Sequence, residues 1–210
     1  MISDSGESKS LYIELLQLHE QLDRNMLASY ARSLPINEEL GDRWVRAKRL
    51  GFGQRTSIYD SCLVYGPPEV GSDCWIGPFC ILDGSGGLTI GDWVTISSGV
   101  HIYTHDSVRR ALSAGREPIL RAPVRIGSQV YLGPNCLVGK GVTIGKQCVV
   151  GAFSFVNRDV PDGSIVVGQP ARIVGTVEDD GNVTQLRFQR RNDESTDEDD
   201  VAGPQATGGP

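Results

Sequence analysis

Aliphatic residues recur at every sixth position through the middle of this 210-residue chain. A helix repeats its apolar face about every 3.6 residues and a strand every second residue, so neither element alone produces this period. The repeat slips by two residues after Leu82 and is interrupted for longer after Ile102. Its members are Ile58, Val64, Val70, Ile76, Leu82, Ile90, Ile96, Ile102, Ile126, Leu132, Val138, Ile144, Val150 and Val156.

A second position of each repeat, four residues after the aliphatic one, is also restricted. It holds Cys62, Cys74, Cys80, Val94, Val100, Val130, Cys136, Val142, Cys148 and Ser154. Short strands joined by turns return such positions to one shared face, and three repeats closing a triangle would make a coil of about 18 residues. Successive coils would pair as parallel strands about 4.8 Å apart. The pattern therefore predicts a mainly β protein, a parallel β-solenoid with a narrow apolar interior.

Glycine often follows the aliphatic residue, as in Val70-Gly71 and Ile76-Gly77. We expect these glycines to occupy corners that need unusual backbone dihedral angles. All five cysteines fall at the second restricted position, where they would point inward as small hydrophobes. Their number is odd and they form no Cys-x-x-Cys pair, which argues against disulfides and a thiolate metal site. A buried thiol would also be a poor nucleophile.

The residues before the repeat predict two helices. In residues 10–33 a leucine stripe runs from Leu11 to Leu22 on one face, and residues 38–50 follow a possible cap at Asn37. We expect these helices to cover the open edge of the first coil, although the stripe could instead pair helices between subunits. The chain then divides into a helical segment 1–55, a solenoid 56–175 and a tail 176–210.

Charge is unevenly distributed along the chain. The net charge is −6, and the segment 176–210 alone holds nine acids and three bases, so the remainder is balanced. A balanced body offers no basic surface for a nucleic acid. The acidic tail is typical of disordered segments. No apolar run reaches membrane-spanning length and no secretion signal opens the chain, so we expect a cytoplasmic protein without membrane insertion.

The long interruption predicts a protruding loop over residues 103–122. It carries His105, one of three histidines in the chain. Long loops on a rigid scaffold are often functional, and an imidazole can exchange a proton near neutral pH. The loop is therefore a candidate functional segment, with a solvated surface histidine as the alternative reading of His105.

An ordered set of motifs surrounds this loop. They are Gly99-Val100-His101-Ile102-Tyr103-Thr104-His105-Asp106, Ala122-Pro123-Val124-Arg125-Ile126-Gly127, Gly141-Val142-Thr143-Ile144-Gly145, Arg158-Asp159-Val160-Pro161 and Gly168-Gln169-Pro170-Ala171-Arg172. Residues 58–175 thereby resemble the hexapeptide-repeat acyltransferases, in the maltose/galactoside O-acetyltransferase branch, whose features polysaccharide O-acetyltransferases share. The resemblance implies a left-handed β-helix and a homotrimer with active sites between subunits. It also implies acetyl-CoA as co-substrate, direct acetyl transfer to a sugar or glycan hydroxyl, and no metal.

The same resemblance assigns roles to individual residues. His105 takes the place of the general base. It places an acceptor contact at Asp83. By their positions beside the loop histidine, His101 could also orient the acceptor, and Asp106 could orient His105 or bind a sugar hydroxyl. Each of the three also reads as an ordinary turn or surface residue. Coenzyme A contacts fall on Tyr131, Pro134, Ala152, Asn157, Arg158 and Arg172. Tyr131, Asn157 and Arg158 stand where the family often has Trp, Thr and Lys, and these replacements keep aromatic, polar and basic character.

Two other functions are compatible with a solenoid. A scaffold or binding protein could keep the coils without catalysis, but it would have no need of the loop histidine. A γ-class carbonic anhydrase needs three zinc-binding histidines across an interface, and the third histidine, His19, lies on a predicted helix. The acceptor itself is not readable from the sequence.

Overall fold

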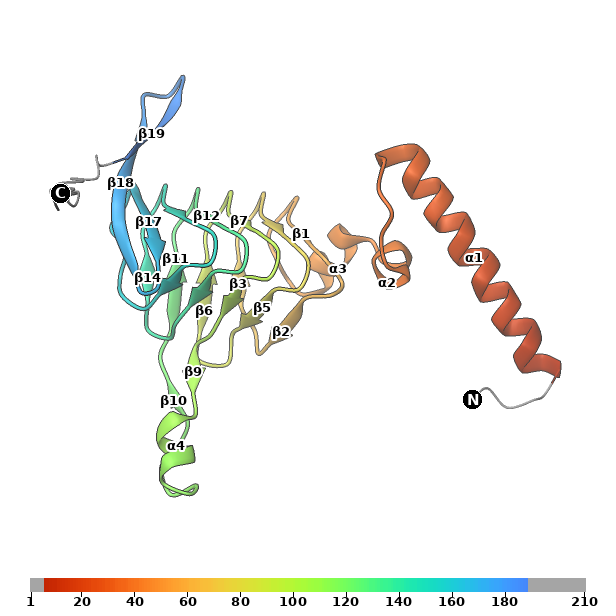
Figure 1. Cartoon of the computed structure of the whole chain (residues 1–210), viewed down its shortest axis with the longest axis horizontal. Coiled ribbons are helices and arrows are strands. Elements are labelled where there is room, and N and C mark those ends of the chain that lie inside the picture. The colour runs from red at the N-terminus through yellow and green to blue at the C-terminus, as the bar shows by residue number, and fades with distance from the viewer. Residues whose placement is uncertain (1–5, 189–210) are drawn as a thin grey trace, which may run out of the picture.

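The computed structural model describes residues 6–188. Over that range the chain forms a parallel β-solenoid with helices at its N-terminal end and an arm leaving its side (Figure 1). The helices are α1 (Gly6–Tyr30), α2 (Ile36–Leu40), α3 (Arg43–Arg49) and, in the arm, α4 (Val108–Leu112). The predicted mainly β solenoid with N-terminal helices is confirmed.

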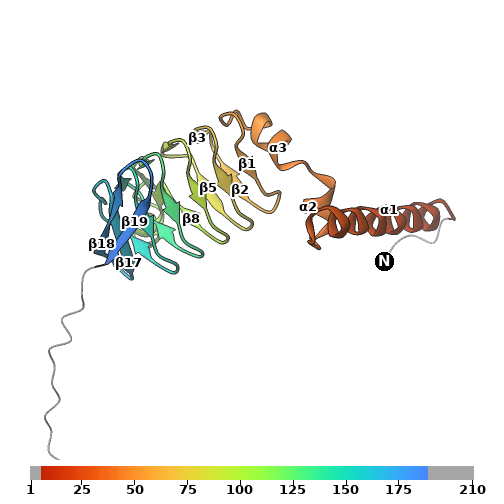
Figure 2. The same cartoon turned by 90° about the horizontal axis from the view of Figure 1, so that it is seen from above.

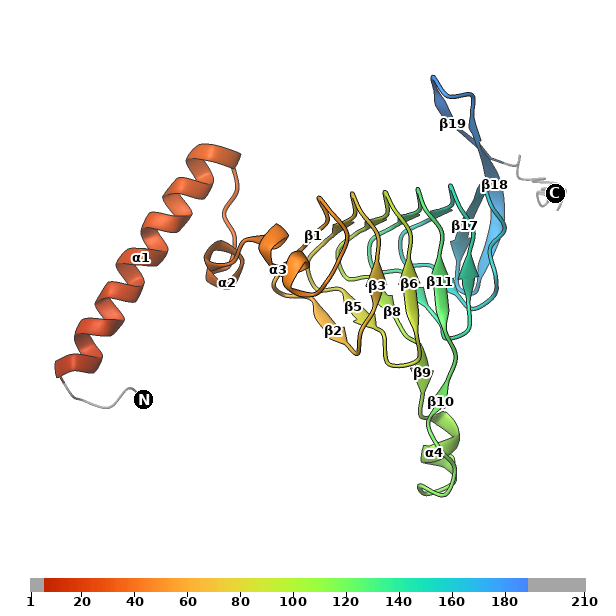
Figure 3. The ribbon, with the colours of Figure 1, turned by 180° about the vertical axis from the view of Figure 1, so that it is seen from behind.

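Three parallel sheets form the sides of the solenoid, and each takes one strand from successive coils, as the view from above shows (Figure 2). The first side contains β1 (Ser57–Ile58), β4 (Trp75–Ile76), β7 (Thr95–Ile96), β12 (Tyr131–Leu132), β15 (Val149–Val150) and β17 (Ser164–Gly168). The second contains β2 (Leu63–Tyr65), β5 (Ile81–Asp83), β8 (His101–Ile102), β13 (Leu137–Val138) and β16 (Phe155–Val156). The third, seen from behind in Figure 3, contains β3 (Glu69–Val70), β6 (Leu88–Ile90), β11 (Val124–Ile126) and β14 (Thr143–Ile144).

The strand register confirms the predicted coil length. Ser57 pairs with Trp75, and Tyr131 pairs with Val149, eighteen positions apart in both cases. Trp75 pairs with Thr95, so the coil that contains the slip is two residues longer. Thr95 in turn pairs with Tyr131, because the arm adds eighteen residues to that coil without adding a strand to the first side.

The interior is filled by the two restricted positions of the repeat. Every aliphatic member is buried except Val64, which is half-buried, and all ten residues at the second position are buried. Each fully buried aliphatic side chain contributes roughly 1.5–3 kcal/mol relative to exposure. A single continuous stack of these side chains therefore holds the coils together.

The glycines after the aliphatic positions differ from expectation. Gly71, Gly77, Gly127 and Gly133 do not have positive φ; the left-handed residues come two positions later, at non-glycine corners such as Gln129 (φ 62°). The reason for glycine is a close approach between coils. A Cβ added at Gly127 would lie 2.8 Å from the carbonyl carbon of Gly145 in the next coil.

The second predicted helix, residues 38–50, is wrong as a single element. Gly41 is extended (φ −103°, ψ 139°) and separates α2 from α3. Asp42 then caps α3, accepting hydrogen bonds from the backbone N–H groups of Trp44 and Val45 at 2.8 and 2.9 Å. The cap was thus Asp42 and not Asn37, because a carboxylate directly before a helix satisfies two of its free N–H groups.

The prediction that the N-terminal helices cover the first coil holds for α3 and for Glu38 of α2, but not for α1. α3 packs on β1 and buries Ala47, whereas α1 projects away from the solenoid and contacts α2 (Figures 1 and 3). Leu11, Leu15 and Leu18 of the leucine stripe remain 41–57% exposed in this chain. The stripe therefore does not fold onto the first coil.

Two charged side chains complete the edge of the first coil. Glu38 is buried and its carboxylate accepts hydrogen bonds from the N–H groups of Asp60 and Ser61, both at 2.8 Å. The Arg46 guanidinium donates to the carbonyl oxygens of Tyr59 and Cys62. These backbone groups have no preceding coil to pair with, so the side chains satisfy them instead.

The C-terminal end departs from the predicted tail boundary. β18 (Ala171–Asp179) pairs antiparallel with β17, and β19 (Thr184–Phe188) pairs antiparallel with β18. Residues 176–188, expected in the tail, therefore belong to this hairpin, because backbone pairing between β18 and β19 outweighs their acidic composition. The rest of the predicted tail lies outside the described residues.

Candidate active site

An arm leaves the third coil between β8 and β11. Its stem is an antiparallel pair, β9 (His105–Asp106) and β10 (Leu120–Arg121), and α4 lies at its tip (Figure 1). The arm spans the region that the sequence marked as residues 103–122. His105 lies at the root of the arm, where it meets the second side of the solenoid.

His105 is held by a carboxylate from the preceding coil. Its Nδ1 lies 2.6 Å from Oδ2 of Asp83, at the end of β5. Asp83 has no exposed surface, whereas the imidazole is 36% exposed. The ring thus has one nitrogen fixed by a buried partner and its other edge open to solvent.

A small hydrogen-bond network holds the carboxylate itself. The backbone N–H of Thr104 donates to Asp83 Oδ2 at 2.8 Å, and the N–H of Ser85 donates to Oδ1 at 3.0 Å. The buried Thr104 hydroxyl lies 2.8 Å from the Asp83 carbonyl oxygen and accepts from the N–H of Gly86 at 2.8 Å. The residues at the slip after Leu82 therefore supply part of the hydrogen-bond network that holds Asp83 in place.

These contacts keep Asp83 ionised. Burial opposes ionisation, but the hydrogen bonds from Ser85, from the Thr104 N–H and from His105 outweigh it, and they hold the pKa of Asp83 well below its ordinary value. An ionised carboxylate can only accept a hydrogen bond, so Nδ1 of His105 carries a proton toward it. In the neutral ring Nε2 is then the free base.

A cleft of about 350 Å³ adjoins the imidazole. Tyr103 stands edge-on to His105, with ring centroids 6.4 Å apart. The walls combine apolar and polar groups from the arm and the second side: Tyr103, His105, Asp106, Leu137, Gly139, Lys140, Phe155 and Asn157. A ligand bound there would touch the open edge of the general-base candidate.

A second cleft, of about 290 Å³, lies between β16 and β18. Asn157, Arg158 and Arg172 all line it, so the structure brings together three of the residues expected to contact coenzyme A. Asn157 also lines the cleft beside His105, and the two hollows are therefore neighbours. The guanidiniums of Arg158 and Arg172 can bind an anionic group in this cleft.

The other three expected coenzyme A residues lie elsewhere. Tyr131 is on the first side, in a separate cleft with residues of the β18–β19 hairpin. Pro134 and Ala152 occupy stacked corners between the first and second sides, where the Phe153 N–H donates to the Pro134 carbonyl. A single copy of the chain does not gather the six residues around one hollow.

Two of the three acceptor candidates, Asp83 and Asp106, differ from expectation. Asp83 is closed off by its neighbours, so it cannot contact an acceptor directly and acts on His105 instead. Asp106 binds Lys140 (Nζ–Oδ2 2.9 Å) and accepts from the Val108 N–H, so it does not orient the imidazole. The Lys140 ammonium lowers the pKa of Asp106. His101 is half-buried on β8, edge-on to Tyr103 at 6.0 Å.

The cysteines lie in the interior as free thiols. Burial raises the pKa of Cys74 and Cys148 and raises that of Cys136 to about 12. Cys62 and Cys80 lie together in the first two coils, and the hydrogen bond between their thiols lowers the pKa of Cys62 and raises that of Cys80. No cysteine lines the cleft beside His105.

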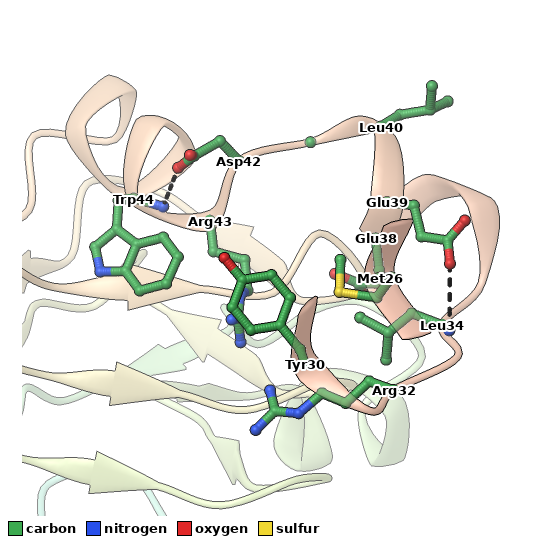
Figure 4. A pocket seen from close by; sticks show the side chains of 11 residues that line it. Met26, Tyr30, Arg32, Leu34, Glu38, Glu39, Leu40, Asp42, Arg43 and Trp44 are labelled. Carbon is green, nitrogen blue, oxygen red and sulfur yellow. Dashed lines mark hydrogen bonds between the residues drawn. The ribbon is translucent and has the colours of Figure 1, made fainter. Parts of the chain in front are cut away.

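Another hollow, of about 310 Å³, lies beyond the first coil among α1, α2 and α3. Figure 4 shows Tyr30 of α1 with Arg43 and Trp44 of α3 around it, while the Glu39 carboxylate turns toward the N–H of Leu34. No histidine is among the described residues that line it. It therefore lacks an imidazole like the one at the root of the arm.

Sequence reasoning missed two contributors to the site. Thr104 was quoted only as part of a motif, and Lys140 was given no contact. The Ser85 hydroxyl lies 3.3 Å from His105 Nδ1. The slip after Leu82 was the available signal, because the residues around it, Ser85 and Gly86, donate hydrogen bonds to Asp83 and Thr104 at the root of the arm.

Within residues 6–188, no group of three histidine, cysteine or acidic side chains is placed to hold a metal ion. Nor does this part of the chain contain a helix with the length and apolarity needed to cross a membrane.

Known proteins share both the repeat and the architecture. Residues 123–158 match the family described as bacterial transferase hexapeptide (six repeats). The chain is 34% identical over 169 residues to Nodulation protein L of Rhizobium meliloti (strain 1021), covering 74% of this chain and 89% of that protein. This chain belongs to the hexapeptide-repeat acyltransferases. It is an acetyltransferase of that family, as the resemblance predicted.

Solved structures of the family agree with the fold. A maltose O-acetyltransferase from Clostridium difficile 630 superposes with a TM-score of 0.58 at 25% identity, covering 80% of this chain and 89% of that one. AntD, an N-acyltransferase from Bacillus cereus, gives a TM-score of 0.53 at 22% identity over 63% of this chain and 87% of that one. The hexapeptide-repeat chain described here is thus an acyl-CoA-dependent acyltransferase of the branch that contains Nodulation protein L and maltose O-acetyltransferase.

Proposed function

We propose that this acyltransferase moves an acetyl group from acetyl-CoA to a hydroxyl of a sugar or glycan, with His105 as general base. The observation that carries the proposal is the Asp83–His105 pair, 2.6 Å apart, at the edge of a cleft of about 350 Å³. A buried carboxylate that fixes one imidazole nitrogen leaves the other free to accept a proton.

The chemistry is a direct transfer. His105 Nε2 takes the acceptor hydroxyl's proton as the oxygen attacks the thioester carbonyl; the C–S bond then breaks, and the imidazolium returns the proton to the departing thiolate. Asp83 stabilises the positive ring while it carries the proton. No protein nucleophile is required, which agrees with cysteines that lie in the interior.

Acetyl-CoA would bind with its thioester beside His105 and its phosphates toward Arg158 and Arg172. The support is geometric: the two clefts share Asn157, and the second cleft contains both guanidiniums. Tyr131, Pro134 and Ala152 lie on a different flank, so they would complete a site only if supplied by a neighbouring copy. A homotrimer with sites between subunits accounts for both sets.

The decisive experiment measures release of free coenzyme A thiol during incubation with acetyl-CoA and a panel of saccharides. Wild-type protein should release thiol in an acceptor-dependent way, and His105→Gln should bind acetyl-CoA but release it at least about a hundredfold more slowly. Acceptor-dependent release that survives in His105→Gln contradicts the assignment. Light scattering coupled to gel filtration tests the trimer; a monomer at working concentration contradicts the shared site.

A further inference from the structure

The arm carries an excess of positive charge that the proposed chemistry does not use. Residues 103–122 hold four arginines against two acids. Both acids are already paired: Asp106 with Lys140 at 2.9 Å, and Glu117 with Arg109 at 3.9 Å. The arginines of the arm without a carboxylate at ion-pair distance, within the described chain, are Arg110, Arg116 and Arg121.

Arg121 is directly opposite His105 in the stem of the arm. The Ala122 N–H donates to the Thr104 carbonyl oxygen at 3.0 Å, which puts Thr104 and Ala122 at a hydrogen-bonding position of the ladder. Pairs alternate along an antiparallel ladder, which makes His105 and Arg121 a pair of the closer, non-hydrogen-bonded kind. Opposed residues project from the same face with Cβ atoms roughly 4.5–5.5 Å apart. The side chains of Arg121 and His105 therefore leave the stem next to each other on one face.

The Arg121 side chain is exposed, and its donors are free for a ligand. A guanidinium presents a planar fork of N–H groups that matches a carboxylate or a phosphate. Lys140, the other cation beside the imidazole, is neutralised by Asp106. Arg121 is thus the arginine that stands opposite His105 in the stem, and no carboxylate of the described residues lies at ion-pair distance from it.

We propose that the acceptor is an anionic saccharide, whose carboxylate or phosphate binds Arg121 while a nearby hydroxyl faces His105. This inference rests on the proposed function, because it places the reacting hydroxyl at His105. Arg121 takes no part in the proton transfer and so determines specificity. The nucleotide phosphates of coenzyme A are separated from the thioester by the pantetheine arm, which makes a cation beside the base suited to the acceptor.

The test compares matched saccharide pairs that differ by one anionic group. Glucose against glucuronate and galactose against galacturonate probe a carboxylate, and glucose against glucose 6-phosphate probes a phosphate. Each is assayed with wild type, Arg121→Gln, Arg121→Lys and Arg116→Gln. Arg116 is an equally exposed arginine of the same arm but lies away from the His105 stem, so it serves as the control.

In wild type, kcat/KM should favour the anionic member of at least one pair about tenfold or more, the scale of a charge-assisted hydrogen bond. Arg121→Gln should lose that preference while the KM for acetyl-CoA and the rate on the neutral sugar stay unchanged. Arg121→Lys should keep part of it, and Arg116→Gln all of it. The preference should also weaken as salt rises from about 0.05 to 0.5 M, because salt screens exposed charges.

The outcomes separate the two proposals. Equal or better use of the neutral sugars, or a preference that survives Arg121→Gln, overturns the anionic acceptor and leaves the acetyltransferase proposal intact. A raised KM for acetyl-CoA in Arg121→Gln with unchanged acceptor preference would assign Arg121 to the co-substrate and also overturns it. Absence of transfer to every saccharide, neutral or anionic, overturns both.

Discussion

Nδ1 of His105 lies 2.6 Å from Oδ2 of Asp83, although twenty-two positions separate the two residues in sequence. The coil register explains the meeting: Ile81 pairs with His101 and Leu82 with Ile102, so the chain just beyond β5 lies beside the chain just beyond β8. The stacked coils therefore place a buried carboxylate against a histidine at the root of the arm.

Replacing Asp83 by Asn tests whether this carboxylate positions the base. The variant keeps the size of the side chain but removes the negative charge that stabilises the protonated imidazole. We expect kcat to fall about 10- to 1,000-fold, part of what a general base contributes, with little change in the KM for acetyl-CoA. Steady-state kinetics against both substrates provide the measurement, and a changed acetyl-CoA KM with normal kcat would speak against a positioning role.

The same variant should change the response of stability to acid. The pKa of Asp83 is held below its ordinary value near 3.8, so the unfolded state binds more protons than the folded state between the two values. The stabilisation from this carboxylate is therefore complete above the ordinary value and is lost as the pH falls through the lowered one. The difference in Tm between wild type and Asp83→Asn should be largest near neutral pH and shrink below about pH 4. A difference that is constant with pH would contradict the lowered pKa.

Arg172→Ala should weaken binding of acetyl-CoA more than turnover. Loss of a charge-assisted contact to a phosphate should raise the KM for acetyl-CoA about tenfold or more while kcat stays within about threefold. Arg125→Ala is the matched control, because Arg125 is an exposed arginine on the third side, outside both clefts. Equal KM values in the two variants would place the phosphates elsewhere.

Gly127→Ala tests the close approach between coils. The added Cβ would lie 2.8 Å from backbone atoms of Gly145 and Lys146, which cannot move without separating two coils. We expect a loss of about 1–3 kcal/mol in the free energy of unfolding, as for other overpacked cores. Gly139→Ala is the control, since its Cβ would find its nearest neighbours at 3.6 Å. Similar Tm values for the two variants would show that the stack tolerates the extra atom.

The solenoid was predictable because its period is imposed by every coil. A side chain such as Ile96 or Val138 must return to the interior after each corner, and this requirement leaves the six-residue pattern in the sequence. The break between α2 and α3 depends on one extended residue, Gly41, which a helical pattern with charged ends conceals. The terminal hairpin was hidden for a similar reason: its pairing with β17 is not visible in its own acidic composition.

The candidate site was predictable in part. The interrupted repeat pointed to His105, but both carboxylates differ from expectation: Asp83 contacts the histidine and Asp106 binds Lys140. Which carboxylate faces an imidazole depends on the alignment of neighbouring coils, and a slip of two residues changes that alignment. Arg121 stands opposite His105 because of the register between β9 and β10, and no spacing in the sequence specifies that register.

A stack of parallel strands has two open ends, where backbone groups could pair with another chain. In this protein other residues cover both ends. Glu38 and Arg46 form hydrogen bonds with backbone groups of the first coil. At the other end, β18 and β19 continue the first side as antiparallel strands after β17. A second molecule that approached end-on would meet charged side chains at one pole and an opposed hairpin at the other, so polymerisation into a fibre of coils is blocked. Lateral contact between flanks is left as the way for copies to assemble.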